Sequence, residues 1–121
     1  MNEKPQFDFE IPAAYDTLLN RGLISFGDSS PLRPWYYLSQ ERVIEMQKEW
    51  PAVGFANRLV AFARRDDSDD VACFEVVAGR VAGVRLVHAW TPEGYKPLDL
   101  YESFWDWVRA VVDDVVEQET F

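Results

Sequence analysis

Residues 59–90, LVAFARRDDSDDVACFEVVAGRVAGVRLVHAW, decide the fold predicted for this chain. Three runs within it, Leu59–Arg64, Val71–Val77 and Arg80–Trp90, are rich in the β-branched and aromatic residues typical of strands. An acidic run connects the first two. Ala78-Gly79 makes a tighter second connection, because glycine tolerates positive φ. Connections this short predict successive antiparallel strands of one sheet.

The segment after the predicted sheet indicates an amphipathic helix that packs on it. Ser103 and Asp106 have the S-x-x-D spacing of a helix N-cap. Large apolar residues then recur at helical spacing, and leaving them in water costs ~1.5 to 3 kcal/mol each relative to burial. The predicted core stripe comprises Phe104, Trp107, Val108, Val111, Val112 and Val115, opposite a polar face of Glu102, Asp106, Arg109, Asp113 and Glu117.

The remaining segments predict a helix over residues 12–21, a short strand over 35–38, a second helix between Ser39 and Pro51, and a loop over 91–97. Together these elements predict an α+β fold, in which N-terminal helices and the C-terminal amphipathic helix flank a single, mostly antiparallel sheet. The predicted stripe of the second helix is Val43, Met46 and Trp50.

Length and composition indicate one folded domain, residues 1–121, with its core at about 11–117. The chain has 121 residues, and 48% of them are hydrophobic, which is too apolar for a disordered protein. Its 12 Lys and Arg face 21 Asp and Glu, so the net charge is −9. A negatively charged surface repels nucleic acid phosphates and anionic lipids. It therefore argues against a nucleic acid or membrane partner and favours a basic protein partner.

Cysteine usage and hydropathy indicate a cytoplasmic protein. The single cysteine, Cys73, excludes an intrachain disulfide and a zinc-ligand cluster. Residues 1–10 carry three acidic side chains and lack the apolar core of a secretory signal. No stretch reaches the ~18 apolar residues that a membrane span requires. We expect no cofactor and no metal.

Two groups of residues suggest a catalytic or a metal-binding site, and each also has an ordinary structural interpretation. Cys73 and His88 lie on neighbouring predicted strands and could form a Cys/His nucleophile pair, although a buried, inert thiol is the ordinary outcome in an apolar run. Asp66, Ser68 and Asp70 alternate as calcium ligands do. However, valines occupy the glycine and glutamate positions that such a loop requires.

The acidic run is the first predicted contact surface. It is either a solvated turn that keeps the strand ends soluble or a surface for a basic partner. Trp35 and Trp90, beside predicted loops, could be core lids or interface anchors. The predicted partner-binding residues are Asp66, Asp67, Asp69 and Asp70, with Trp90, Glu93 and Tyr95 as the second candidate region.

The ordered set of elements resembles the SUKH superfamily of Smi/Knr-like domains, many of which are bacterial immunity proteins. The resemblance spans about residues 11–117 and differs in carrying Arg21-Gly22 where a paired glycine is common. It rests on Ile11-Pro12, Tyr15, Leu18-Leu19, Asn20-Arg21-Gly22, Trp35, Phe62-Ala63, Asp69-Asp70, Ala72-Cys73-Phe74 and Ser103-Phe104-Trp105-Asp106-Trp107.

The resemblance implies a non-catalytic domain that neutralises a cognate toxin, often a nuclease, encoded beside it in a polymorphic toxin system. The residues themselves lead to protein binding independently, because the chain is acidic and shows no catalytic motif. The alternative is a regulatory or scaffold module of the same superfamily. A small hydrolase that uses Cys73 or His88 is the third hypothesis.

Overall fold

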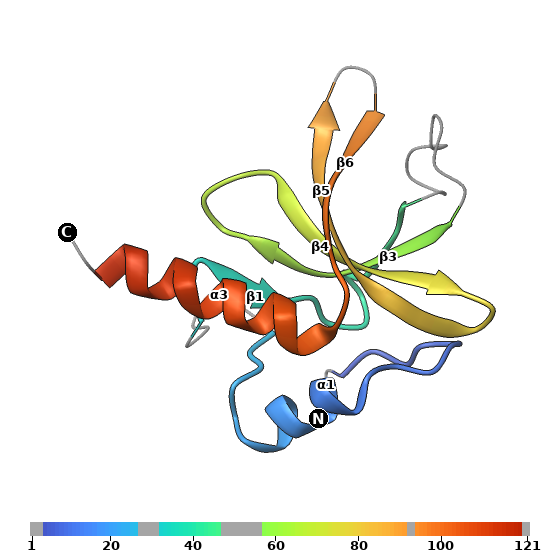
Figure 1. The fold of residues 1–121 in the computed structure, drawn as a ribbon, viewed down its shortest axis with the longest axis horizontal. Coiled ribbons are helices and arrows are strands. Elements are labelled where there is room, and N and C mark those ends of the chain that lie inside the picture. Colours follow the sequence, from blue (N-terminus) through green and yellow to red (C-terminus); the bar gives the residue numbers. More distant parts are fainter. Residues whose placement is uncertain (1–3, 27–31, 47–56, 92–93, 120–121) are drawn as a thin grey trace.

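The computed structural model describes residues 4–26, 32–46, 57–91 and 94–119; the side chains of residues 89–91, 94–95 and 118–119 are not described. The fold is α+β, with one mostly antiparallel sheet and a helix near each end of the chain (Figure 1). The described elements are α1 (Ala13–Asn20), β1 (Trp35–Tyr37), β2 (Ile44–Glu45), β3 (Arg58–Arg65), β4 (Asp70–Val77), β5 (Arg80–Thr91), β6 (Gly94–Tyr101) and α3 (Phe104–Glu119).

The sheet has the strand order β1-β3-β4-β5-β6, and every pair of neighbours is antiparallel. β1 and β2 lie end to end along the same edge of β3. Tyr37 pairs with Ala63 in the second half of β3, and Ile44 pairs with Ala61 in the first half. The predicted antiparallel sheet is therefore confirmed, and it carries strands that the sequence did not indicate.

Both helices lie on one side of the sheet, where they enclose an aromatic core (Figure 1). Phe62 and Phe74 line the centre of this face. The opposite face has a smaller core, in which Leu38 and Met46 cover side chains from β3, β4 and β5. The core on the helical side includes Tyr15 and Leu18 of α1 and Phe104, Trp107, Val108 and Val111 of α3; the other contains Leu59, Ala61, Val71, Cys73 and Val87.

The end of α1 and the start of α3 follow the sequence prediction. α1 ends at Asn20, and Gly22 terminates it with a left-handed φ of 75°, while the backbone N–H of Leu23 donates to the carbonyl of Leu18 at 2.9 Å. At the start of α3, the Ser103 hydroxyl accepts a hydrogen bond from the backbone N–H of Asp106 at 3.1 Å. One core assignment was wrong: Val112 is 44% exposed, because it lies beyond the rim of the buried stripe.

The second helix was wrong over residues 39–45. The carbonyl of Ser39 accepts hydrogen bonds from Arg42 and Val43, which makes a turn, and Ile44 then begins β2. The backbone groups on the edge of β3 need hydrogen-bond partners, and the β-branched pair Val43-Ile44 suits an extended backbone. Met46 is fully buried, and the rest of the predicted helix lies outside the described residues.

The predicted loop over residues 91–97 was wrong for Thr91, which ends β5, and for residues 94–97, because Gly94–Tyr101 forms β6; residues 92–93 lie outside the described part of the chain. Pro97 opposes Val87 of β5 and is tolerated because β6 is an edge strand. Gly83 was the overlooked signal: a Cβ built there would lie 2.6 Å from the carbonyl oxygen of Tyr101. Glycine inside a strand indicates such a close approach of another backbone.

Ala78 offers a stability test of the β4–β5 turn. Its φ is 53° and that of Gly79 is 78°, so both turn residues are left-handed, a conformation that alanine adopts at a cost. We expect Ala78→Asn to raise the free energy of unfolding by about 0.5 to 1 kcal/mol, because asparagine tolerates this backbone. Urea unfolding measures the change. Ala82→Asn, at an exposed strand position, is the matched control and should give no gain.

Candidate functional site

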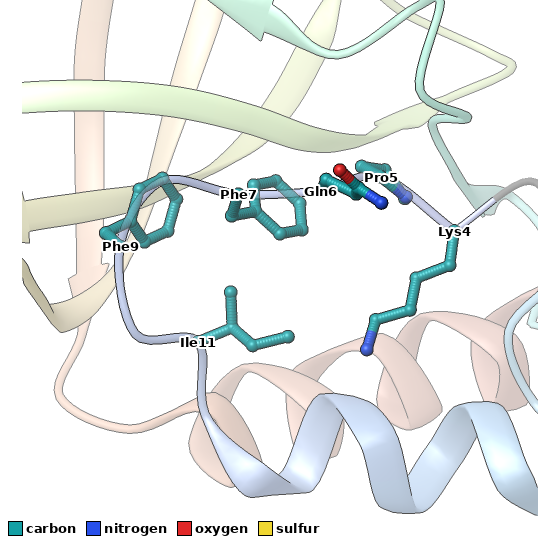
Figure 2. A pocket seen from close by; sticks show the side chains of 6 residues that line it. All are labelled: Lys4, Pro5, Gln6, Phe7, Phe9 and Ile11. Atoms are coloured by element: carbon teal, nitrogen blue, oxygen red, sulfur yellow. The ribbon is translucent and has the colours of Figure 1, made fainter.

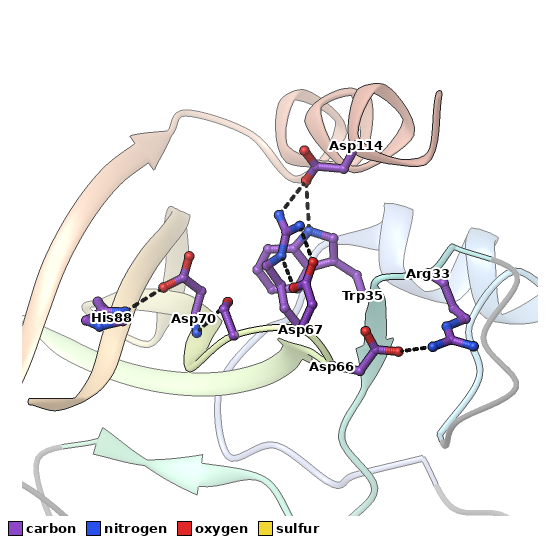
Figure 3. A network of polar contacts seen from close by, with 9 residues as sticks. Arg33, Trp35, Asp66, Asp67, Asp70, His88 and Asp114 are labelled. Carbon is purple, nitrogen blue, oxygen red and sulfur yellow. Dashed lines mark hydrogen bonds and ion pairs between the residues drawn. The ribbon is translucent and has the colours of Figure 1, made fainter. Parts of the chain in front are cut away.

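The acidic turn, residues 66–70, connects β3 to β4 and is the first predicted binding surface (Figure 3). Asp66, Asp67 and Asp69 are exposed, and Asp70 is the first residue of β4. The Asp66 carboxylate lies 2.9 Å from the Arg33 guanidinium. The backbone N–H of Asp70 donates to the Ser68 hydroxyl at 3.2 Å, which tightens the turn.

Arg65 connects the acidic turn to helix α3. Its Nε and Nη2 donate to both carboxylate oxygens of Asp67, at 2.7 and 3.0 Å, a bidentate geometry. Its Nη1 donates to Asp114 of α3 at 3.2 Å, and the indole N–H of Trp35 donates to the same carboxylate at 3.0 Å (Figure 3). The guanidinium also lies 5.7 Å from the centre of the Trp35 ring. These contacts fix the turn against the helix.

Asp70 contacts the only histidine of the chain. Its carboxylate lies 2.8 Å from Nδ1 of His88, and the two residues are direct cross-strand partners. Asp66, Asp67 and Asp70 therefore each have a cationic or imidazole neighbour. Asp69 is the one aspartate of the turn for which the described residues supply no ionic partner. The turn thus has a structural role that the sequence did not indicate.

The second candidate region lies at the same end of the sheet as the acidic turn. Asp70 pairs with His88, His88 pairs with Lys96, and the β5–β6 hairpin continues beyond them to the Thr91–Gly94 pair. The backbones of Trp90 and Tyr95 belong to this hairpin. Their side chains, and Glu93 as a whole, lie outside the described residues. The strand register therefore places the described backbone of this hairpin beside the start of β4, and the contact role of both regions stays a prediction.

Trp35 and Trp107 belong to the core. Trp35 is 2% exposed and meets Trp107 edge to face, with ring centroids 5.6 Å apart. The core assignment of Trp107 is confirmed. For Trp35 the structure favours the core lid over the interface anchor, since its indole N–H is already bonded to Asp114.

Cys73 and His88 are not brought together. Cys73 opposes Arg85 and His88 opposes Asp70, so about three residues, or roughly 10 Å, of strand separate them. Burial, and secondarily the charge of Glu75, raise the pKa of the Cys73 thiol well above its ordinary value. The thiol is therefore protonated and shielded. Within the described ranges, no group of three or more His, Cys, Asp and Glu side chains is arranged to hold a metal ion.

A buried ion pair on the sheet face opposite the helices was missed from the sequence. Glu75 is 5% exposed, and it is the only buried charged residue in the described part of the chain. Its carboxylate accepts hydrogen bonds from Nε of Arg85 at 2.8 Å and from the Asn57 amide at 2.9 Å. Arg85 also donates to the carbonyl of Leu98 in β6, at 3.1 Å. Side chains alternate between the two faces of a strand, and this alternation along β4 could have indicated that Glu75 points into a buried face.

The N-terminal segment forms a cavity of about 510 Å³ between itself and α1 (Figure 2). Lys4 and Ile11 point into it from the two ends of the segment. The amine of Lys4 is paired with Asp16 of α1. Lys4 is the only titratable side chain in the described lining, so that lining offers no acid–base pair of its own. The lining residues are Lys4, Pro5, Gln6, Phe7, Phe9 and Ile11.

No protein-family model, curated protein or solved structure matches this chain. Among the described residues, no helix combines the length and hydrophobicity needed to span a bilayer. The assignment of function therefore depends on the surface of the chain itself.

Asp67 and Asp69 give a matched test of the turn. The hydrogen bond from Arg65 lowers the pKa of Asp67, so its stabilisation is fully present above the unfolded pKa, near ~3.9, and is lost as the pH falls through the lower folded value. We expect Asp67→Asn to lower the free energy of unfolding by about 0.5 kcal/mol at pH 7, since the pair is solvent-screened. Asp69→Asn should change nothing measurable. Urea unfolding between pH 7 and pH 2 should show the Asp67→Asn difference disappearing in acid; a constant difference would contradict this account.

Breaking the buried Glu75–Arg85 pair should lower the free energy of unfolding more than breaking the Arg65–Asp67 pair does. Arg85→Met leaves the Glu75 carboxylate buried without its cation, and we expect a loss of about 3 kcal/mol in the free energy of unfolding. The double variant Glu75→Met/Arg85→Met removes both charges and should recover most of that loss. Urea unfolding of the single and double variants is the measurement. Equal losses in both would show that packing, and not charge, holds this site.

Proposed function

We propose that this chain is a non-catalytic, protein-binding domain that works as an immunity protein. It neutralises a cognate bacterial toxin in the cytoplasm by direct binding, and the toxin surface that it meets is basic. The observation that carries the proposal is the excess of 21 acidic over 12 basic side chains, a net charge of −9.

The distribution of the charged groups supports this function. Of the described acidic side chains, Glu75 alone is buried, so the other described carboxylates are accessible or half-accessible. Such a surface raises the encounter rate with a basic protein by ~10 to 10³ at low salt. If the toxin is a nuclease, acidic side chains can occupy the place of the substrate phosphates in its basic groove.

The acidic turn is the proposed steering region. It lies at an end of the sheet, beside the β5–β6 hairpin, and Arg65 fixes its shape through Asp67. A turn with a defined shape loses less conformational entropy on binding than a loose one. The resemblance to the SUKH superfamily supports the same function.

Co-expression with the product of the neighbouring gene tests the proposal. We expect this chain to restore growth of cells that express the toxin and to co-elute with it in gel filtration. Replacing Asp66, Asp67, Asp69 and Asp70 by Asn should slow association and flatten its dependence on ionic strength, because peripheral charges act mainly on the on-rate.

Two outcomes would count against this function. If cells die as readily with this chain as without it, and no complex elutes, the immunity assignment is wrong for that pair. If the neighbouring gene encodes no toxin and the chain binds a cellular protein instead, the regulatory or scaffold alternative replaces it. An association rate that is unchanged in the Asn variant at two ionic strengths would place the contact away from the turn.

A further inference from the structure

One flank of α3 exposes three apolar side chains that the core does not use. Trp105 and Val112 are each 44% exposed, and Val116 is 56% exposed. Single exposed apolar residues are ordinary on any surface. These three follow the spacing i, i+7, i+11 and therefore form one stripe, which extends about 16 Å along the helix axis.

An acidic ridge borders the exposed stripe. Each apolar residue is followed directly by an acidic one. Asp106, Asp113 and Glu117 therefore have the same i, i+7, i+11 spacing and form a second row, displaced from the stripe by one residue position around the helix. Asp113 and Glu117 are exposed, and Asp106 is half-exposed and paired with Arg109 at 3.0 Å. The other border of the stripe is the buried face of α3, which includes Val108 and Val111. The exposed Arg109 lies between the stripe and the ridge, because it is four residues after Trp105 and four before Asp113. Apolar anchors thus lie between the protein core and a polar border that consists of Arg109 and the carboxylates.

We propose that this flank of α3, comprising Trp105, Val112 and Val116 with the ridge of Asp106, Asp113 and Glu117, is the docking surface for the basic partner. The proposal rests on the protein-binding function proposed above and assigns its contact surface. The partner inserts apolar side chains against Trp105 and Val112 and places Lys or Arg side chains along the ridge.

Charge complementarity selects this occupant over a second copy of the chain. Two copies packed antiparallel through α3 would oppose acidic ridge to acidic ridge, and in any arrangement each copy has a net charge of −9. Like charges placed together across an interface cost several kcal/mol. A basic partner gains from both features, because its apolar anchors meet the stripe and its cations meet the ridge.

The opposite face of α3 makes the surface rigid. Phe104 and Trp107 are buried against Phe62, with ring centroids 5.7 and 5.0 Å away. Asp114 is held by Trp35 and Arg65 near the C-terminal half of the helix. A helix fixed in this way presents its outer side chains in one arrangement, which reduces the ordering cost of binding. Tryptophan is also among the residues enriched in binding hot spots.

A synthetic peptide tests the surface in the full chain. The probe is a fluorescein-labelled helical peptide of about 18 residues, with Leu along one face and Lys elsewhere. Two control peptides replace Lys by Glu or Leu by Ser. We expect the first peptide alone to bind strongly by fluorescence anisotropy, since only it offers both apolar anchors and cations.

Two pairs of variants place the binding on α3. Trp105→Ala should weaken binding at least ~10-fold, the usual size of a hot-spot loss, whereas Val77→Ala, at a comparably exposed position outside the helix, should not change it. Asp113→Asn/Glu117→Gln should weaken binding and flatten its salt dependence. Glu41→Gln/Asp99→Asn removes the same charge from exposed sites outside the turn and α3, and is the matched control.

Four results would overturn this assignment. If wild type and Trp105→Ala bind the peptide equally, the apolar stripe is not part of the binding surface. If the two double charge variants weaken binding equally, the peptide responds to the overall negative charge and not to the ridge. If analytical ultracentrifugation shows a dimer that the Trp105→Ala substitution dissociates, the surface binds a second copy of this chain. If the toxin from the co-expression test binds Trp105→Ala normally, the proposed function stands and this surface assignment fails.

Discussion

Phe62 of β3 and Phe74 of β4 stack at the centre of the sheet, with ring centroids 4.1 Å apart and planes 17° from parallel. Both described helices and the N-terminal segment contact this pair. Tyr15 of α1 and Phe104 of α3 touch both rings, and the N-terminal segment reaches Phe74 through Phe7 and Phe9. Aromatic pairs contribute ~0.5 to 1.5 kcal/mol beyond the burial of their area. One stacked pair therefore positions two helices and a terminal segment that are distant in the sequence.

The position of α3 links the core to both proposed contact regions. Its inner face is fixed by the aromatic cluster, and Asp114 connects it through Arg65 to the acidic turn. The exposed flank at Trp105 and Val112 is consequently held by the same packing that stabilises the fold. In the proposed complex, the charges of the turn mainly increase the association rate, and the apolar anchors on α3 mainly decrease the dissociation rate.

The ion pairs limit what the net charge alone can indicate. The sequence shows four aspartates within five residues, but in the fold Asp66 and Asp67 pair with Arg33 and Arg65. Asp70 is hydrogen-bonded to His88. Among the described residues, the three acids of the α3 ridge have a single ion pair, that of Asp106 with Arg109. An excess of charge in the sequence therefore indicates that a basic partner is favoured, whereas the position of unpaired charge depends on which cations the fold brings near.

Local features determined the elements that the sequence predicted well. Strands β3, β4 and β5, the turn at Ala78-Gly79 and the capped start of α3 follow from period, turn chemistry and capping within a few residues. Tertiary structure decided the rest. Residues 44–45 became a strand because the edge of β3 needs partners, and Pro97 was accepted because β6 lies at an edge. The Arg65–Asp114 and Arg85–Glu75 pairs, and the exposure of Val112, likewise depend on which surfaces meet, because such contacts join residues that no local pattern connects.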